Sequence, residues 1–115
     1  MVRVFIGLSA AALVLTAGAA QAQGPDQDVR CMIASNLFVK AEKDPARRQV
    51  AMLASYFYLG RVDARLSGAG LAGALKAQSA AITPASAGPV MTECAKRMQS
   101  AGMAMQTLGR QIGAK

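Results

Sequence analysis

The sequence predicts an all-α fold, a small four-helix domain whose third helix is short. Apolar residues recur at steps of three and four through three long stretches, which is the spacing of one helix face. Two dipeptides, Asp44-Pro45 and Thr83-Pro84, are typical helix starts, since Asp or Thr caps the first turn and Pro suits the first helical position. No stretch has the alternation of a half-buried strand, and none repeats at a fixed period.

Residues 1–22 have the features of a secretory signal peptide. Arg3 supplies a positive charge, an apolar run follows to about Leu15, and Ala20-Gln21-Ala22 is a small-x-small cleavage pattern. The alternative is an uncleaved membrane anchor, which the Ala- and Gly-rich run and the cleavage site disfavour. We expect a disordered lead-in over residues 23–27 and a single helical domain over 28–113. The predicted location is periplasmic or secreted, after cleavage near Ala22.

Cys31 and Cys94 are the only cysteines of the chain. An even count in an exported protein predicts one disulfide between them. Closing a loop of roughly sixty residues would stabilise the fold by about 4 kcal/mol on the chain-entropy model. The Cys-x-x-Cys turn that is typical of redox-active pairs is absent.

The first helix is expected from Asp26 or Asp28 to about Lys43. Acidic residues at its start and basic residues at its end suit the helix dipole. Cys31 and Phe38 fall on one apolar stripe, which would face the core. Pro45 forces this helix to stop, because proline disfavours helical backbone in the preceding residue.

The second helix is expected from Pro45 to about Leu66 and is apolar on most of its circumference. Such a helix is normally the buried centre of its domain. Gly60, in the interior of this helix, would let a neighbouring helix cross closely. A narrow polar sector remains, formed by Arg47, Tyr58, Arg61 and Arg65.

The last two helices complete the domain. Residues 67–70 predict a loop with a left-handed cap, and a short helix from Leu71 to about Ile82 follows. Gly88-Pro89 either ends a short turn or kinks the start of the last helix, expected from about Val90 to Ile112. That helix carries one regular seam, which we expect to face the core along its whole length: Met91, Cys94, Met98, Ala101, Met105, Leu108 and Ile112.

Few catalytic chemistries fit this composition. The chain has no His, its six carboxylates show no metal-ligand spacing, and a disulfide would leave no thiolate. The sequence therefore predicts no enzyme, no cofactor and no metal site. Gly68, Gly70 and Gly73 satisfy the dinucleotide-binding pattern, but a helix and not a strand precedes them. Four methionines of the last helix could suggest a soft-metal site or a plastic binding groove, yet three lie on the seam and are better explained as core.

The candidate interaction surface lies on the second helix. Asp63 falls in its apolar sector, where a carboxylate needs a partner. It either pairs with a cation of a neighbouring helix or reaches solvent, or it forms with Tyr56 and a basic residue a polar spot that recognises a partner. The stripe of Arg47, Arg61 and Arg65 is either a solvated face or a site for anionic lipid or polymer.

The formal net charge is +7, and loss of Arg3 with the signal peptide would lower it by one. A basic exported domain favours anionic surfaces or acidic partner proteins, although the charge could serve solubility alone. The basic residues form no long run, so a nucleic-acid partner is not expected.

Two resemblances follow from short stretches. Ile82-Thr83-Pro84-Ala85 leading to Cys94 is similar to the periplasmic acid-stress chaperone family of HdeA, small helical domains with one disulfide. The cysteine separation is longer here and the chain is strongly basic, which departs from that family. The Phe57-Tyr58-Leu59-Gly60 segment between two cysteines resembles periplasmic immunity proteins of the Rap/Tai type. The overall layout of the chain resembles that of small exported all-helical two-cysteine proteins, and no functional residue is carried over.

We therefore expect a non-enzymatic periplasmic or secreted protein that binds another exported protein, as a chaperone, adaptor or inhibitor does. The alternative is a peripheral binder of anionic membrane or envelope polymer that acts through a basic face.

Overall fold

The computed structural model of the chain describes residues 24–113, and the predicted signal peptide lies outside them. Four helices follow one another along the chain: α1 (Pro25–Ala41), α2 (Pro45–Arg65), α3 (Gly68–Ala81) and α4 (Pro84–Gly113). The predicted all-α fold is confirmed, and no strand is present in the described part of the chain. Helix α1 begins at Pro25, so most of the lead-in expected to be disordered is helical.

Capping hydrogen bonds confirm the helix starts predicted at Asp44-Pro45 and Thr83-Pro84. The Asp44 carboxylate accepts a hydrogen bond from the Arg47 backbone N–H at 3.2 Å, which caps α2. At the start of α4, the Thr83 hydroxyl accepts from the Ser86 N–H at 3.2 Å, and the Ser86 hydroxyl accepts from the Thr83 N–H at 2.9 Å. These reciprocal bonds satisfy donors that the first helical turn leaves free.

Two boundaries differ from expectation. Helix α3 begins at Gly68 rather than Leu71, and Gly68 holds the left-handed backbone that the loop was predicted to need, with φ of 54°. Helix α4 begins at Pro84 and continues through Pro89 without a break in its assignment. Pro89 is the sixth residue of α4, so the helix continues although one backbone hydrogen bond is missing at this position.

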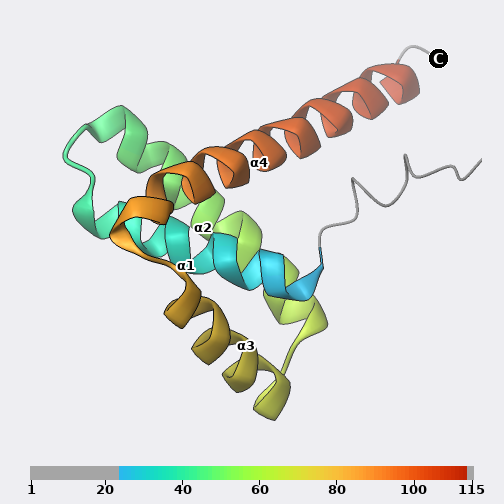
Figure 1. Ribbon diagram of the computed structural model, residues 1–115. Helices are drawn as coiled ribbons and strands as arrows, with labels where there is room; N and C mark the ends of the chain where they lie inside the picture. Colours follow the sequence, from blue (N-terminus) through green and yellow to red (C-terminus); the bar gives the residue numbers. More distant parts are fainter. Residues whose placement is uncertain (1–23, 114–115) are drawn as a thin grey trace, which may run out of the picture.

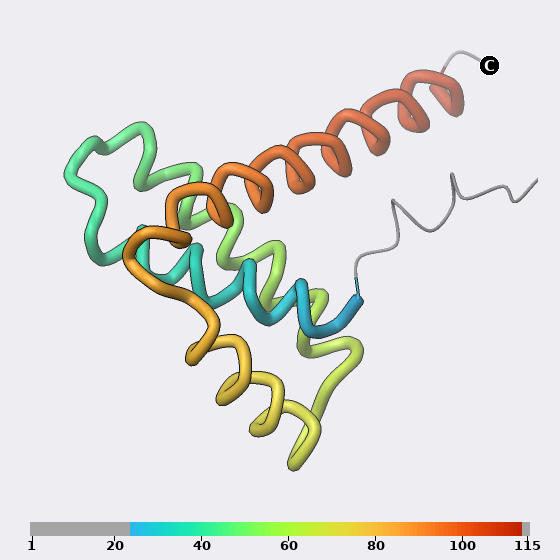
Figure 2. Tube along the Cα trace, viewed as in Figure 1, coloured from blue at the N-terminus to red at the C-terminus, as the bar shows by residue number. Residues whose placement is uncertain are grey.

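Helices α1 and α2 form the central pair, and α3 and α4 pack against it from different sides (Figures 1 and 2). One core cluster surrounds Tyr58 and the cysteines, where α1, α2 and α4 meet. A second cluster joins Val29, Val62 and Ala74, and it holds α3 against α1 and α2. Small residues dominate the closest packing of the central pair, because Ala34 and Ala54 are completely buried.

Helix α2 was expected to be buried on nearly all sides, and that expectation is wrong. Its buried residues are Ala51, Ala54, Tyr58 and Val62, which form a single stripe. Tyr58, placed by the sequence in the polar sector, is the largest fully buried side chain of the described residues. Among residues 24–113, no atom of another helix lies within 4 Å of a Cβ added at Gly60, so no described helix crosses there.

The seam of α4 is buried over less than half of its length. Met91 and Cys94 are buried and Met98 and Ala101 are partly covered, but every residue from 102 to 113 is exposed. This last part of the helix, hereafter the α4 arm (residues 102–113), extends away from the other helices (Figures 1 and 2). The expectation that the whole seam faces the core is therefore wrong for the arm.

None of the helices in the described part of the chain is both long and apolar enough to cross a membrane.

Candidate functional site

The predicted disulfide is present and ties α1 to α4. Cys31 and Cys94 are bonded, with Cα atoms 5.5 Å apart and a sequence separation of 63 residues. Beside it, the Tyr58 hydroxyl donates a hydrogen bond to the Cys94 carbonyl at 2.7 Å, which connects α2 to the same point of α4. Burial raises the pKa of Tyr58 from 10.0 to about 12, and the charges of Arg97 and Arg61 partly oppose this rise.

A buried carboxylate organises the polar part of the interior, and it is not the one that the sequence suggested. Asp28 on α1 is fully buried. Its Oδ1 accepts from Arg61 Nε at 3.0 Å and its Oδ2 from Arg65 Nη1 at 3.3 Å, so both oxygens bind guanidinium groups of α2. Charge-assisted bonds of this kind compensate the desolvation of a buried carboxylate.

Asp63, in contrast, is exposed on α2. Of the alternatives expected for it, the carboxylate therefore reaches solvent, because the sector of α2 that it shares is not buried. Tyr56 is also exposed, at 66%. The two residues are seven positions apart, or nearly two helical turns, and so lie on the same side of the helix.

The predicted arginine stripe is divided in the structure. Arg61 and Arg65 bind Asp28 at the end of α2, whereas Arg47 lies at its start and forms an exposed pair with Asp44 at 3.8 Å. The five candidate surface residues therefore separate into an outer pair, Tyr56 and Asp63, and three arginines placed elsewhere.

Large apolar side chains surround Tyr56 on the solvent side of α2. Met52, Leu53 and Leu59 are 38%, 52% and 51% exposed. We call these three residues and Tyr56 the outer face of α2. It lies opposite the stripe that packs in the core. The sequence showed that these residues are apolar, but it did not show that the described part of the chain leaves them exposed.

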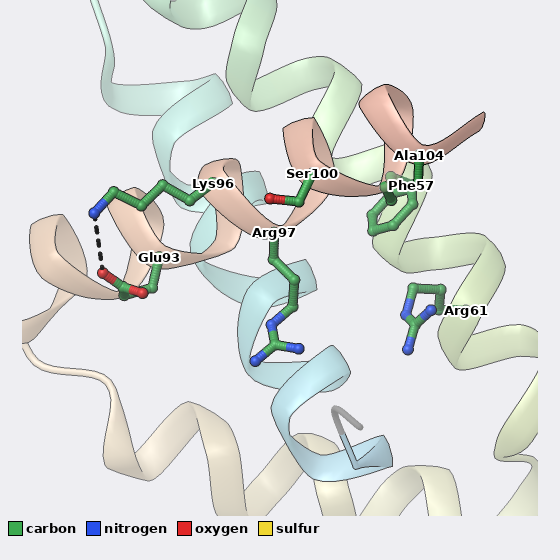
Figure 3. A pocket seen from close by; sticks show the side chains of 8 residues that line it. Phe57, Arg61, Glu93, Lys96, Arg97, Ser100 and Ala104 are labelled. Atoms are coloured by element: carbon green, nitrogen blue, oxygen red, sulfur yellow. Dashed lines mark ion pairs between the residues drawn. The ribbon is translucent and has the colours of Figure 1, made fainter. Parts of the chain in front are cut away.

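A groove of about 590 Å³ separates α2 from α4 at the point where the arm leaves the other helices (Figure 3). Phe57 and Arg61 line it from α2, and the α4 wall consists of Glu93, Lys96, Arg97, Ser100, Ala101 and Ala104. The Arg61 guanidinium lies 5.8 Å from the centroid of the Phe57 ring, within the range of a cation–π contact. Lys96 and Glu93 form an exposed pair at 3.7 Å.

Sequence reasoning missed Asp28 and this groove. A signal for Asp28 existed, since Asp28, Cys31 and Ser35 follow one another at steps of three and four and all three are buried. The groove depends on where α4 departs from α2, and no local pattern encodes that point.

Within residues 24–113, no group of three His, Cys, Asp or Glu side chains lies in a position to hold a metal ion. Comparisons with protein families, with curated proteins and with solved structures find no match to this chain.

Proposed function

We propose that this protein is a non-enzymatic periplasmic or secreted binding protein, and that the outer face of α2 is where it holds another exported protein. The observation that carries the proposal is the exposure of Met52, Leu53, Tyr56 and Leu59 together on one side of one helix. Contiguous exposed apolar surface is typical of protein interaction sites. Tyr and Met are also enriched at the centres of such interfaces.

The surroundings of the outer face suit a protein partner. Asp63 lies one turn beyond Leu59 and is exposed, which places a charge at the rim of the apolar area. Interfaces commonly have this arrangement of an apolar centre and a polar rim. The disulfide supports an exported location, because such bonds persist in oxidising compartments.

A photo-crosslinking residue at position 56 tests this proposal in the native cell envelope. We expect discrete crosslinked products that survive high salt, since apolar burial is insensitive to charge screening. The matched control is the same residue at position 76, because Lys76 is exposed on α3, away from the outer face. Leu53→Asp should abolish the products obtained at position 56. Equal products at both positions, or products that Leu53→Asp leaves intact, would contradict the proposal.

A second candidate function is binding of an anionic membrane or envelope polymer. Arg61 and Arg65 bind Asp28 and are therefore engaged within the protein. The basic surface that remains for an anionic membrane or polymer is the turn between α1 and α2. Lys40, Lys43, Arg47 and Arg48 are all exposed there. Cosedimentation with vesicles that contain anionic lipid should then be strong at low salt and fall steeply as salt is added. Charge reversal at Arg47 and Arg48 should remove it.

A further inference from the structure

The α4 arm is a helical segment without a packing partner among the described residues. Met105, Leu108 and Ile112 are 70%, 53% and 75% exposed. An isolated helix shorter than about 12–15 residues is marginal in water, and helices in proteins depend mainly on packing of an apolar face. A surface that covers the arm would therefore stabilise both its apolar side chains and its helical backbone.

The spacing of the arm is that of a coiled-coil seam. Residues 91, 94, 98, 101, 105, 108 and 112 alternate steps of three and four, which is the a/d pattern of a heptad repeat. The first four of these positions are buried or partly covered against α1 and α2. The last three continue the same side of the helix past the point where α4 leaves those helices (Figures 1 and 2). The arm therefore offers an exposed apolar seam, with the spacing of a coiled coil, against which a second helix could pack.

The residues beside the seam indicate what kind of helix fits. Gly102, Ala104 and Gly109 flank it and are small, and nothing lies within 4 Å of a Cβ added at either glycine. The arm carries one charge, Arg110, at a heptad position remote from the seam. An acidic partner would find no cation along the seam. A second copy of this neutral surface meets no like charge there, although the whole chain is strongly basic.

We propose that two copies of this chain associate through their α4 arms, which pair antiparallel about a two-fold axis. This inference concerns a different surface from the outer face of α2 and does not depend on the function proposed for that face. Antiparallel pairing sets each a position against a d position of the partner. Met105 then lies against Leu108, and Ile112 lies against Ala101, a large side chain against a small one.

The groove at the root of the arm receives the tip of the other arm in this arrangement. Ala101 and Ala104 line the groove, and at 1.5 Å per residue they lie about 17 Å and about 12 Å along the helix from Ile112.

Placing the tip of each arm in the groove of the other copy also increases the surface area that the dimer buries. Two arms alone form a short contact, and specific interfaces bury about 1,200–2,000 Å² in total. A two-fold axis makes each contact of tip with groove occur twice, so the groove of about 590 Å³ enlarges the buried surface at both ends of the arm pair.

Sedimentation equilibrium of the purified protein tests the proposal with a pair of matched variants. Met103 and Met105 are 67% and 70% exposed on the same arm, but only Met105 lies on the seam. We expect a dimer whose dissociation constant rises about tenfold or more in Met105→Lys, because a charge would be buried without a partner. Met103→Lys should change it by less than about twofold, as expected for a site outside the interface.

Circular dichroism of both variants should match the original chain, since both positions are exposed and carry no core contact. A chain that stays monomeric up to about 0.5 mM, a concentration at which even weak complexes form, would overturn the proposal. An equal effect of the two variants would also overturn it.

A photo-crosslinking residue at position 108 distinguishes arm pairing from other dimers. With a mixture of isotope-labelled and unlabelled chains, the intermolecular product should join position 108 to the arm of the other copy, around Met105. A product that joins position 108 to the outer face of α2 would overturn the antiparallel arm pair.

Discussion

Asp28 illustrates at the scale of one residue how this fold accepts a buried charge. Its carboxylate is fully buried, whereas the side chains of Arg61 and Arg65 are 36% and 44% exposed. The arginines can therefore return to solvent when their partner is lost, but the carboxylate cannot. Removing one side of the ion pair should cost more than removing the other.

We predict that the double variant Arg61→Met, Arg65→Met loses about 3–5 kcal/mol of unfolding free energy, the cost of leaving a buried charge uncompensated. Asp28→Asn should lose about 1–3 kcal/mol, because the released guanidinium groups are solvated and the amide keeps some hydrogen bonds. Urea unfolding measures both.

Asp63→Asn is the matched control for this comparison, because Asp63 is an exposed carboxylate on the same helix as the two arginines. It should change the unfolding free energy by less than about 0.5 kcal/mol. If Asp28→Asn proved as costly as loss of the two arginines, the proposed asymmetry would be wrong.

The buried Tyr58 should make the folded protein less stable at alkaline pH. Burial raises its pKa from 10.0 to about 12 in the folded state, so the folded chain holds this proton where the unfolded chain releases it. The contribution is complete below the unfolded pKa and is lost as pH rises toward 12, by about 1.4 kcal/mol per unit within that window.

Urea unfolding of the original chain and of Tyr58→Phe, at about pH 9 and about pH 11, isolates this effect from other titrating groups. At the lower pH Tyr58→Phe should be less stable by about 1 kcal/mol, the value of its hydrogen bond to Cys94. At the higher pH that difference should shrink or reverse. A constant difference for Tyr58→Phe would contradict the prediction.

At the scale of the helices, the sequence predicted type and order well but orientation poorly. Capping residues and prolines act locally, so the starts of α2 and α4 could be read from Asp44-Pro45 and Thr83-Pro84. The pairing of Cys31 with Cys94 followed from the count of cysteines. Which side of α2 faces α1 depends on tertiary packing.

The buried side of α2 was predicted wrongly because its large apolar side chains do not lie in the core. Leu53 and Leu59 suggested a core position, yet the interface with α1 uses alanines, which let two helices approach closely. Tyr58 appeared polar on a helical projection, but its hydroxyl finds a carbonyl acceptor on α4 and its ring fills the core. The candidate surface was accordingly predicted only in part, and Asp28 was missed.

Gly60 gives a prediction at this scale. It lies inside α2, is exposed, and has open space where a Cβ would stand. Gly60→Ala should therefore raise the unfolding free energy by about 0.5–1 kcal/mol, because alanine restricts the unfolded chain and favours helix.

Ala54→Gly should have the opposite effect and lower the unfolding free energy. Ala54 is fully buried between helices, so loss of its side chain would also create a small void. Both variants can be followed by thermal unfolding. A decrease in stability for Gly60→Ala would show that a close contact exists at that position.

At the scale of the whole molecule, a small core supports two separate apolar surfaces that residues 24–113 leave exposed. The clusters around Tyr58 and around Val29 hold the four helices together without the outer face of α2 or the α4 arm. Substitutions on either surface should therefore leave the fold intact and change association alone. This separates the two proposed interactions from stability, and it also allows them to be separated from each other.

If the arm serves a second copy and the outer face serves a different protein, the two associations are independent. Met105→Lys should then yield a monomer that still forms the crosslinked products at position 56. Leu53→Asp should remove those products and keep the dimer, because additivity holds for distant sites without shared partners. Sedimentation and crosslinking on the same two variants measure all four results. Loss of the products in Met105→Lys would instead mean that the partner binds a surface completed by the dimer.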